Sequence, residues 1–173
     1  MAWEYSKIDR EVTTRWKKMG DFGEYVAEKL LSEHGFTKIR NLNKERHNNL
    51  FADIYAVKNK KSYVISVKAR NKYENNGRLN SRYKLGKDCY EKAPILEREH
   101  KSIAAWISIA IDIDNKTFDA YFGVLASLSG NTGIPMTQEA TKTYQCLASY
   151  RALEDMGVKE KEYMQLKNLY KRK

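Results

Sequence analysis

The sequence predicts an α/β protein in which a central β-sheet is flanked by helices. Residues 22–34 repeat apolar side chains with a helical period, and residues 50–70 contain two strand-like runs around a lysine-rich turn. Residues 102–113 form a continuous apolar run rich in β-branched side chains, which is typical of a buried strand. An apolar fraction of 42% in 173 residues is enough for a core, and this length favours a single domain.

The N-terminal part is predicted to form two helices. Aromatic and apolar residues at helical intervals predict the first helix within residues 1–20, and Gly20 is expected to end it. Asp21 is then expected to cap the second helix over residues 22–34, and Glu24 completes a capping box.

The remaining elements follow from alternation, turn residues and apolar runs. We expect strands at 36–42, 50–57, 61–70, 102–113 and 117–126, loops at 43–49 and 71–87, and helices at 88–100, 137–156 and 158–171. This order divides the single domain into an N-terminal helical arm (1–20), a core (21–130) and a C-terminal helical extension (131–173).

The charge distribution favours an anionic partner. The net charge is +10, and residues 58–101 contain 13 basic and five acidic residues. Such a concentrated positive charge attracts polyanions, of which nucleic acid is the usual one, although basic residues can also serve solubility alone.

Other features of the composition exclude several classes of protein. No apolar run is long enough for a membrane span, and the charged N-terminus does not have the pattern of a signal peptide, so we expect a cytoplasmic protein that does not bind membranes. Cys89 and Cys146 lack neighbours at metal-ligand spacing, which argues against a disulfide framework or a zinc site.

The predicted hairpin carries polar groups that a structural role does not require. Ser66 and Lys68 share one face of its second strand, and Asp53 interrupts the apolar run of its first strand. If Asp53 lies across the strand pair, its carboxylate and the Lys68 amine face the same volume. Asp53 as a strand-end residue bonded to a loop amide, and Lys68 as a solvated lysine, are the structural alternatives.

Three segments resemble the PD-(D/E)xK nuclease superfamily, in particular its Holliday-junction resolvases. They are GEYVAEKLLSEHGF, ADIYAV and YVISVKAR, within residues 23–70. The resemblance implies a restriction-endonuclease-like αβββαβ core with a mixed central sheet flanked by helices, followed here by C-terminal helices. The predicted order of elements agrees with this core.

The resemblance also implies a function and a set of site residues. It implies a metal-dependent DNA endonuclease of resolvase or restriction type that acts on duplex or branched DNA as a homodimer. Asp53 and Glu24 would hold Mg²⁺ or Mn²⁺ together with the backbone carbonyl of Val67, and Lys68 would contact the phosphate or the attacking water. Oxygen ligands of this kind suit Mg²⁺, which keeps several of its waters. Glu24 also has a purely structural alternative as a capping residue.

Ser66 departs from the family pattern, because a glutamate is usual at this position. A neutral hydroxyl weakens the attraction for a cation, so a catalytically degenerate nuclease-fold protein that binds DNA, or a subunit of a larger assembly, is the alternative. A protein-interaction domain without a nucleic-acid ligand is a third hypothesis.

Basic and aromatic residues near the predicted site are expected to contact DNA phosphates, bases or sugars. The candidates are Arg70, Lys72, Tyr73, Arg78, Arg82, Tyr83, Lys84 and Lys87. A solvated, mobile loop is the alternative interpretation of this segment.

Overall fold

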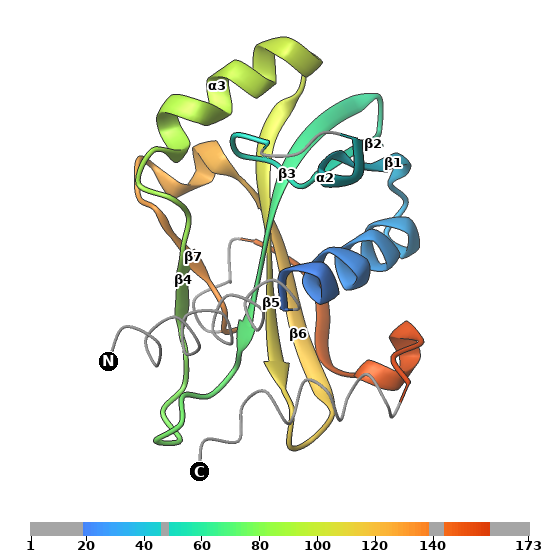
Figure 1. The fold of residues 1–173 in the computed structure, drawn as a ribbon, viewed down its shortest axis with the longest axis vertical. Coiled ribbons are helices and arrows are strands. Elements are labelled where there is room, and N and C mark those ends of the chain that lie inside the picture. The colour runs from blue at the N-terminus through green and yellow to red at the C-terminus, as the bar shows by residue number, and fades with distance from the viewer. Residues whose placement is uncertain (1–18, 46–48, 139–143, 160–173) are drawn as a thin grey trace, which may run out of the picture.

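A six-stranded sheet forms the centre of the protein (Figure 1). The computed structural model describes residues 19–45, 49–138 and 144–159. The strand order is β1-β2-β3-β5-β6-β8. The strands are β1 (Thr37–Asn41), β2 (Ile54–Lys58), β3 (Lys61–Asn71), β5 (Ile103–Asp112), β6 (Thr117–Val124) and β8 (Gln145–Ala152). A second, two-stranded sheet pairs β4 (Arg82–Lys84) with β7 (Gly133–Pro135).

The sheet is mixed, as predicted. β2 and β3 form an antiparallel hairpin whose turn residues Asn59 and Lys60 both have positive φ, the geometry that two-residue hairpin turns favour. β3 and β5 are parallel, and the chain crosses between them through α3 (Cys89–His100). A helix over residues 19–33, then β1, β2, β3, α3 and β5, gives the predicted αβββαβ order.

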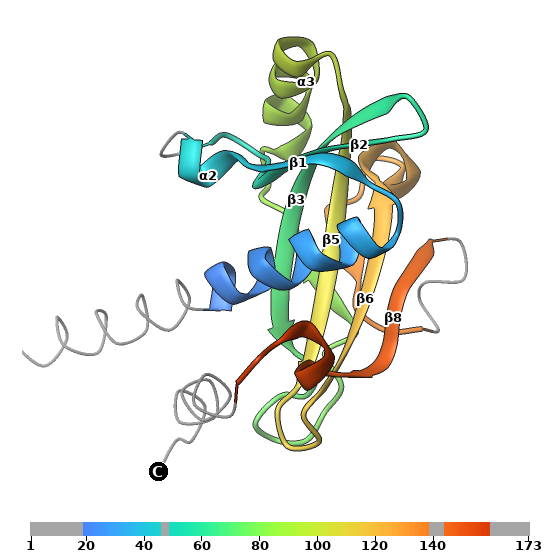
Figure 2. The ribbon, with the colours of Figure 1, turned by 90° about the vertical axis from the view of Figure 1, so that its right-hand side faces the viewer.

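Figure 2 shows the helix before β1 on one face of the sheet and α3 on the other, and a hydrophobic layer lies on each face. The helix at 19–33 buries Val26, Leu30 and Leu31 against one face, where Ile65 and Ile107 meet them. The opposite face is covered by α3, by the β4–β7 pair and by a 3₁₀ helix, η1 (Leu125–Leu128). Because alternate side chains of a strand point to opposite faces, Val64 and Trp106 pack into this second layer.

The start of the described chain differs from the prediction. Residues 19–33 are helical, so Gly20 does not break a helix and Asp21 lies within one instead of capping it. The capping-box interpretation of Glu24 is therefore wrong. The predicted first helix lies mainly in residues 1–18, outside the described residues.

The C-terminal segment also differs, because residues 145–152 form strand β8 and not a helix. Leu147 and Ala148 are both buried although they are adjacent in the sequence. Adjacent apolar residues break the alternation expected of a strand and therefore look like part of a helical pattern. The register with β6 shifts between Phe118 and Ala120 and again before Tyr121, and such irregularities place successive side chains on one face. Beyond β8 lies a 3₁₀ helix, η3 (Leu153–Met156), and the predicted helix at 158–171 falls almost wholly outside the described residues.

The basic segment at 71–87 is more ordered than a mobile loop. Tyr73 and Leu79 form a backbone bridge, Asn80 donates its backbone N–H to the Lys72 carbonyl at 2.8 Å, and β4 pairs with β7. Among the residues that the structure describes, no helix combines the length and the hydropathy of a membrane span.

Candidate functional site

Asp53 lies where β2 separates from β3. Its backbone N–H donates to the Ile65 carbonyl at 2.9 Å, and its carboxylate oxygen Oδ2 accepts the Val67 N–H at 2.7 Å. Residues 65 and 67 therefore direct their backbone polar groups toward this edge. In an extended strand the carbonyl of a residue points to the same side as its N–H, so the Val67 carbonyl faces the Asp53 carboxylate region.

Glu24 lies on the helix at 19–33, which covers one face of the sheet, and its side chain reaches the same region as Asp53. Its neighbour Gly23 packs so closely on β3 that a Cβ atom there would lie 2.6 Å from the Cβ of Ala69. This close approach brings the first turns of the helix against the strand that follows Asp53 in the hairpin. The carboxylate of Glu24 accepts hydrogen bonds from Asn41 at 2.9 Å and from Asn43 at 2.7 Å.

One amide group joins the two acids. Asn43 Nδ2 donates to Glu24 Oε1 at 2.7 Å and to Asp53 Oδ1 at 2.9 Å, and Asn43 Oδ1 accepts from Asn49 Nδ2 at 3.2 Å. Two carboxylates from separate segments thus converge on a single donor. Sequence analysis missed these asparagines, although their concentration just before Asp53 is a signal that could have identified them.

The electrostatics of the two acids are unfavourable for their charged forms. Burial raises the pKa of Asp53 above its ordinary value, against hydrogen bonds from Val67 and Asn43 and the charge of Lys68. Burial also raises the pKa of Glu24, and the nearby charge of Asp53 adds to this effect against hydrogen bonds from the asparagines. A cation between the two carboxylates would relieve both effects.

Lys68 and Ser66 occupy the face of β3 opposite the helix, because Val67 packs into the helix-side layer. Lys68 is half-buried, it acts on Asp53 electrostatically, and no acid lies within ion-pair distance of it in the described parts of the chain. Ser66 is only 2% exposed and pairs in register with Trp106. The charge of Lys68 therefore acts on Asp53 without a direct ion pair among the described residues, whereas Ser66 is a buried neutral group.

The donor set fits a hard cation through oxygen atoms of mixed type. In the described residues, no three or more His, Cys, Asp or Glu side chains group closely enough to hold a metal ion. Two other acids are engaged elsewhere: Asp112 accepts hydrogen bonds from Asn115, and Asp119 pairs with Lys72. A cation would therefore depend on Asp53, Glu24, the Val67 carbonyl and neutral side-chain oxygens, which is a donor set that Mg²⁺ or Mn²⁺ accepts.

The predicted DNA-contacting residues do not all lie on the surface. Lys72 is a correction, because it is 6% exposed and its Nζ lies 2.8 Å from Asp119. Tyr83 is half-buried and stacks under the Arg70 guanidinium, 5.2 Å from its ring centre, which places β4 beside the end of β3. The other exposed candidates are Arg70, Tyr73, Arg78, Arg82, Lys84 and Lys87.

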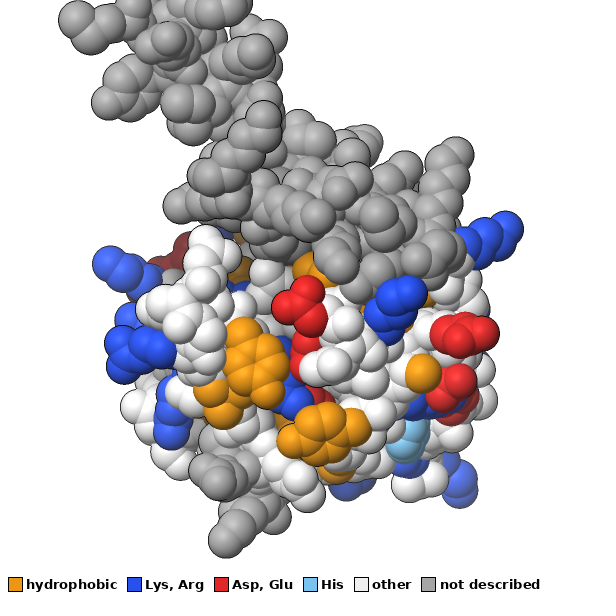
Figure 3. Space-filling view, turned by 90° about the horizontal axis from the view of Figure 1, so that it is seen from below, with side chains coloured by type: hydrophobic (Ala, Val, Ile, Leu, Met, Phe, Trp, Pro, Cys, Tyr) orange, Lys and Arg blue, Asp and Glu red, His pale blue; other side chains and the backbone are white. Residues whose placement is uncertain are grey.

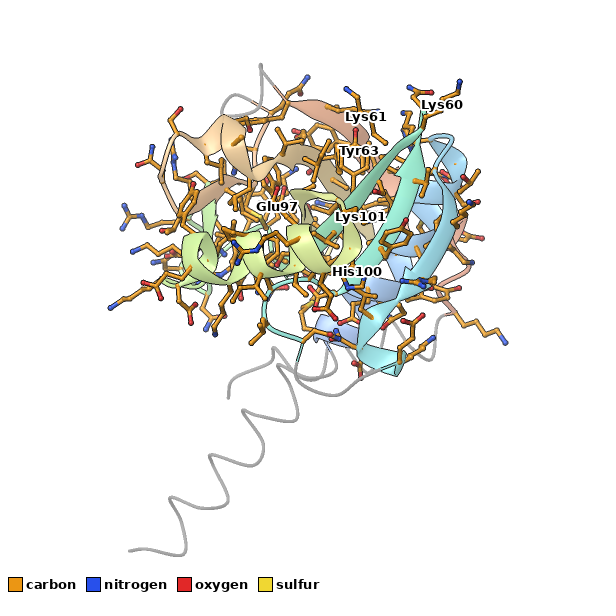
Figure 4. All side chains as sticks on the ribbon, turned by 90° about the horizontal axis from the view of Figure 1, so that it is seen from above. Lys60, Lys61, Tyr63, Glu97, His100 and Lys101 are labelled. Carbon is orange, nitrogen blue, oxygen red and sulfur yellow. The ribbon has the colours of Figure 1, made fainter. Side chains whose placement is uncertain are left out.

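Two ends of the molecule carry different surfaces. Figure 3 looks at the lower end, where hydrophobic side chains lie beside acidic and basic ones. Lys72 lies under Tyr150 at 4.0 Å, and Tyr150 is 69% exposed. Figure 4 shows Lys60 and Lys101 at the opposite end, near the β2–β3 turn and the end of α3. Positive charge is therefore not confined to the surface beside Asp53.

Comparison with known proteins finds a likeness in structure but none in sequence families. No family model matches the chain, and no curated protein matches it. A Holliday junction resolvase from Archaeoglobus fulgidus, a hyperthermophilic archaeon, is similar in structure with a TM-score of 0.45 and 16% sequence identity. The match covers 75% of this chain and 93% of the resolvase. A likeness at this level does not assign the chain to a family.

Proposed function

We propose that the protein is a metal-dependent endonuclease that hydrolyses phosphodiester bonds in DNA. The observation that carries this proposal is the convergence of Glu24 and Asp53 on one donor, with the Lys68 amine close to Asp53. Two partly buried carboxylates lie beside a lysine that forms no ion pair within the described residues, and their raised pKa values are typical of functional sites.

The site residues have distinct roles in this proposal. Asp53, Glu24 and the Val67 carbonyl hold Mg²⁺ or Mn²⁺, which supplies charge neutralisation at the phosphate and acidifies water when it is bound. Asp53 is fixed by the Val67 N–H, so its carboxylate is oriented before any ligand arrives. Lys68 contributes a positive charge toward the phosphate and its attacking water.

The exposed basic residues extend this site toward a substrate. Arg70 follows Lys68 on the same face of β3, and the β4 residues Arg82 and Lys84 continue the positive charge. DNA of duplex or branched form is the substrate that we propose on this basis. The homodimer, the cytoplasmic location and the recognised DNA structure remain predictions from the sequence, and light scattering of the purified protein tests the first.

The test is cleavage of linear, supercoiled and four-way-junction DNA with Mg²⁺ or Mn²⁺. Asp53→Ala and Lys68→Ala are expected to lower the rate by more than about a hundredfold, because each removes a group that acts on the reacting phosphate. Lys101→Ala is the matched control, since it removes an exposed lysine at the far end of the molecule and should leave the rate unchanged. Absence of cleavage of all three substrates with both metals would refute the proposal.

Ser66 favours a second candidate function, a nuclease fold that binds DNA without cutting it. The side chain is neutral and buried at the position where the resemblance leads one to expect a carboxylate. Ser66→Glu separates the two. A sharp rise in cleavage would mark the native site as degraded, whereas an unchanged or lower rate would mark Ser66 as part of a working arrangement. The non-cutting protein would still bind DNA in a salt-dependent, metal-independent way.

A further inference from the structure

The amide of Asn43 lies between Glu24 and Asp53, the two acids that a shared cation would bind. Its Nδ2 lies 2.7 Å from one carboxylate and 2.9 Å from the other. A cation shared by these two carboxylates would bind the oxygens at which the Nδ2 hydrogens point, so the two hydrogen bonds and the cation compete for the same lone pairs. A nitrogen that carries two hydrogens also has no lone pair to offer a cation. Binding therefore requires the Asn43 amide to move.

The same side chain also contains a carbonyl oxygen, Oδ1, which can bind a cation. An amide presents a donor and an acceptor on one planar unit, and a half-turn about the Cβ–Cγ bond exchanges them. After that turn the Asn43 oxygen lies beside the two carboxylates, which is favourable only with a cation bound to all three groups. Asn49, which now donates to the Asn43 oxygen, is also an amide, so its own oxygen is the group that would accept from the turned Asn43.

We propose that Asn43 is a cation ligand of this site and takes the place of the carboxylate that Ser66 lacks. Without a cation, its nitrogen holds the two acids together; with a cation, its oxygen completes the ligand set. This inference rests on the metal dependence proposed above. It follows from the Glu24–Asn43–Asp53 contact, from the burial of Ser66 and from the absence of a third nearby acid among the described residues.

Isothermal titration of the full-length protein with MnCl₂, without DNA, tests the inference. Asn43→Ala is expected to weaken Mn²⁺ binding by about tenfold or more, the range typical of groups that support a metal site. Asn41→Ala is the matched control, because the Asn41 side chain also donates to Glu24 but, within the described residues, forms no hydrogen bond with the Asp53 carboxylate. A ligand role for Asn43 requires the loss in Asn43→Ala to be clearly larger than the loss in Asn41→Ala.

The opposite result has a defined meaning. If Asn43 merely blocks the site, its removal frees both carboxylates, and Asn43→Ala binds Mn²⁺ as well as or better than the wild type. That outcome overturns the inference but leaves the proposed function intact, provided that Asp53→Ala abolishes binding. Failure of the wild-type protein to bind Mn²⁺ at all refutes both. If Asn43→Ala does not fold by circular dichroism, Asn43→Asp decides: tighter binding supports the ligand role, and equal or weaker binding refutes it.

Discussion

The packing of Gly23 on β3 allows a quantitative test of how the helix is held near the site. A Cβ atom at position 23 would lie 2.6 Å from the Cβ of Ala69, whereas ordinary contacts are 3.4–4 Å. In Gly23→Ala the helix must therefore withdraw from β3 by about 1 Å, or the strand must shift by a similar amount. Overpacking of this kind costs about 1–3 kcal/mol of unfolding free energy. For a chain of this length, each kcal/mol lowers Tm by about 2–4 °C.

The same helix provides a matched control. A Cβ atom at Gly20 would meet nothing within 4 Å, so Gly20→Ala is free of any clash. It should raise stability by about 0.4–1 kcal/mol, because alanine restricts the unfolded chain and favours helix. The free energies of unfolding of the wild type, Gly23→Ala, Ala69→Gly and the double variant, measured in urea, then form a double-mutant cycle. Ala69→Gly removes the clashing methyl group, and the next contact of the new Cβ, Val67 Cγ1 at 3.6 Å, is ordinary.

We expect a favourable coupling of about 1 kcal/mol or more between positions 23 and 69, the range for residues in direct contact. Mn²⁺ affinity should follow the same cycle, because Glu24 is carried by the displaced turn. Equal stabilities of Gly23→Ala and Gly20→Ala would refute the close packing. A coupling near zero would do the same, even if Gly23→Ala were destabilised.

Two further predictions concern charged groups. Asp119→Ala should lower the free energy of unfolding by about 3–5 kcal/mol, because it leaves the buried Lys72 ammonium unpaired; urea unfolding measures this loss. A smaller loss in the Asp119→Leu, Lys72→Met double variant would confirm that the unpaired charge is the cause. Burial raises the pKa of Asp53, so the folded protein binds the Asp53 proton more tightly than the unfolded chain does. The protonated carboxyl therefore contributes to the free energy of unfolding below about pH 4, and this contribution is lost as pH rises through the folded-state pKa. In EDTA, Asp53→Asn should therefore gain stability relative to wild type between pH 4 and pH 7, and a constant difference would contradict this.

Local signals were sufficient for most of the fold. Hydrophobic period, turn residues and the apolar run at 102–113 correctly indicated the helix before β1, the β2–β3 hairpin, α3 and β5. β8 was missed because its pairing with β6 is irregular, and a bulge removes the alternation on which sequence reasoning depends. Asn43 was missed for a different reason, since its contacts join three segments that only the folded chain brings together.

Lys72 illustrates how tertiary structure overturns a prediction made from local sequence. The residue lies in the most basic part of the sequence, yet the end of β3 places it under Tyr150 and against Asp119. Burial alone would lower the pKa of Lys72, but the hydrogen bond and the charge of Asp119 outweigh it and raise the pKa. The lysine is thus charged and buried in an ion pair with Asp119. Its counter-charge lies 47 residues away in the chain, beyond the reach of local patterns.

Charge balance explains how a neutral Ser66 is compatible with a phosphate substrate. In the proposed site, the two carboxylates would balance one divalent cation, and Lys68 would then leave a positive charge for an anionic diester. A glutamate at position 66 would bind the cation more strongly but cancel the charge of Lys68, so phosphate binding would weaken. The ligand role proposed for Asn43 would supply a neutral oxygen without that loss. Tighter Mn²⁺ binding together with weaker DNA binding in Ser66→Glu is the outcome that this balance requires, and stronger DNA binding would contradict it.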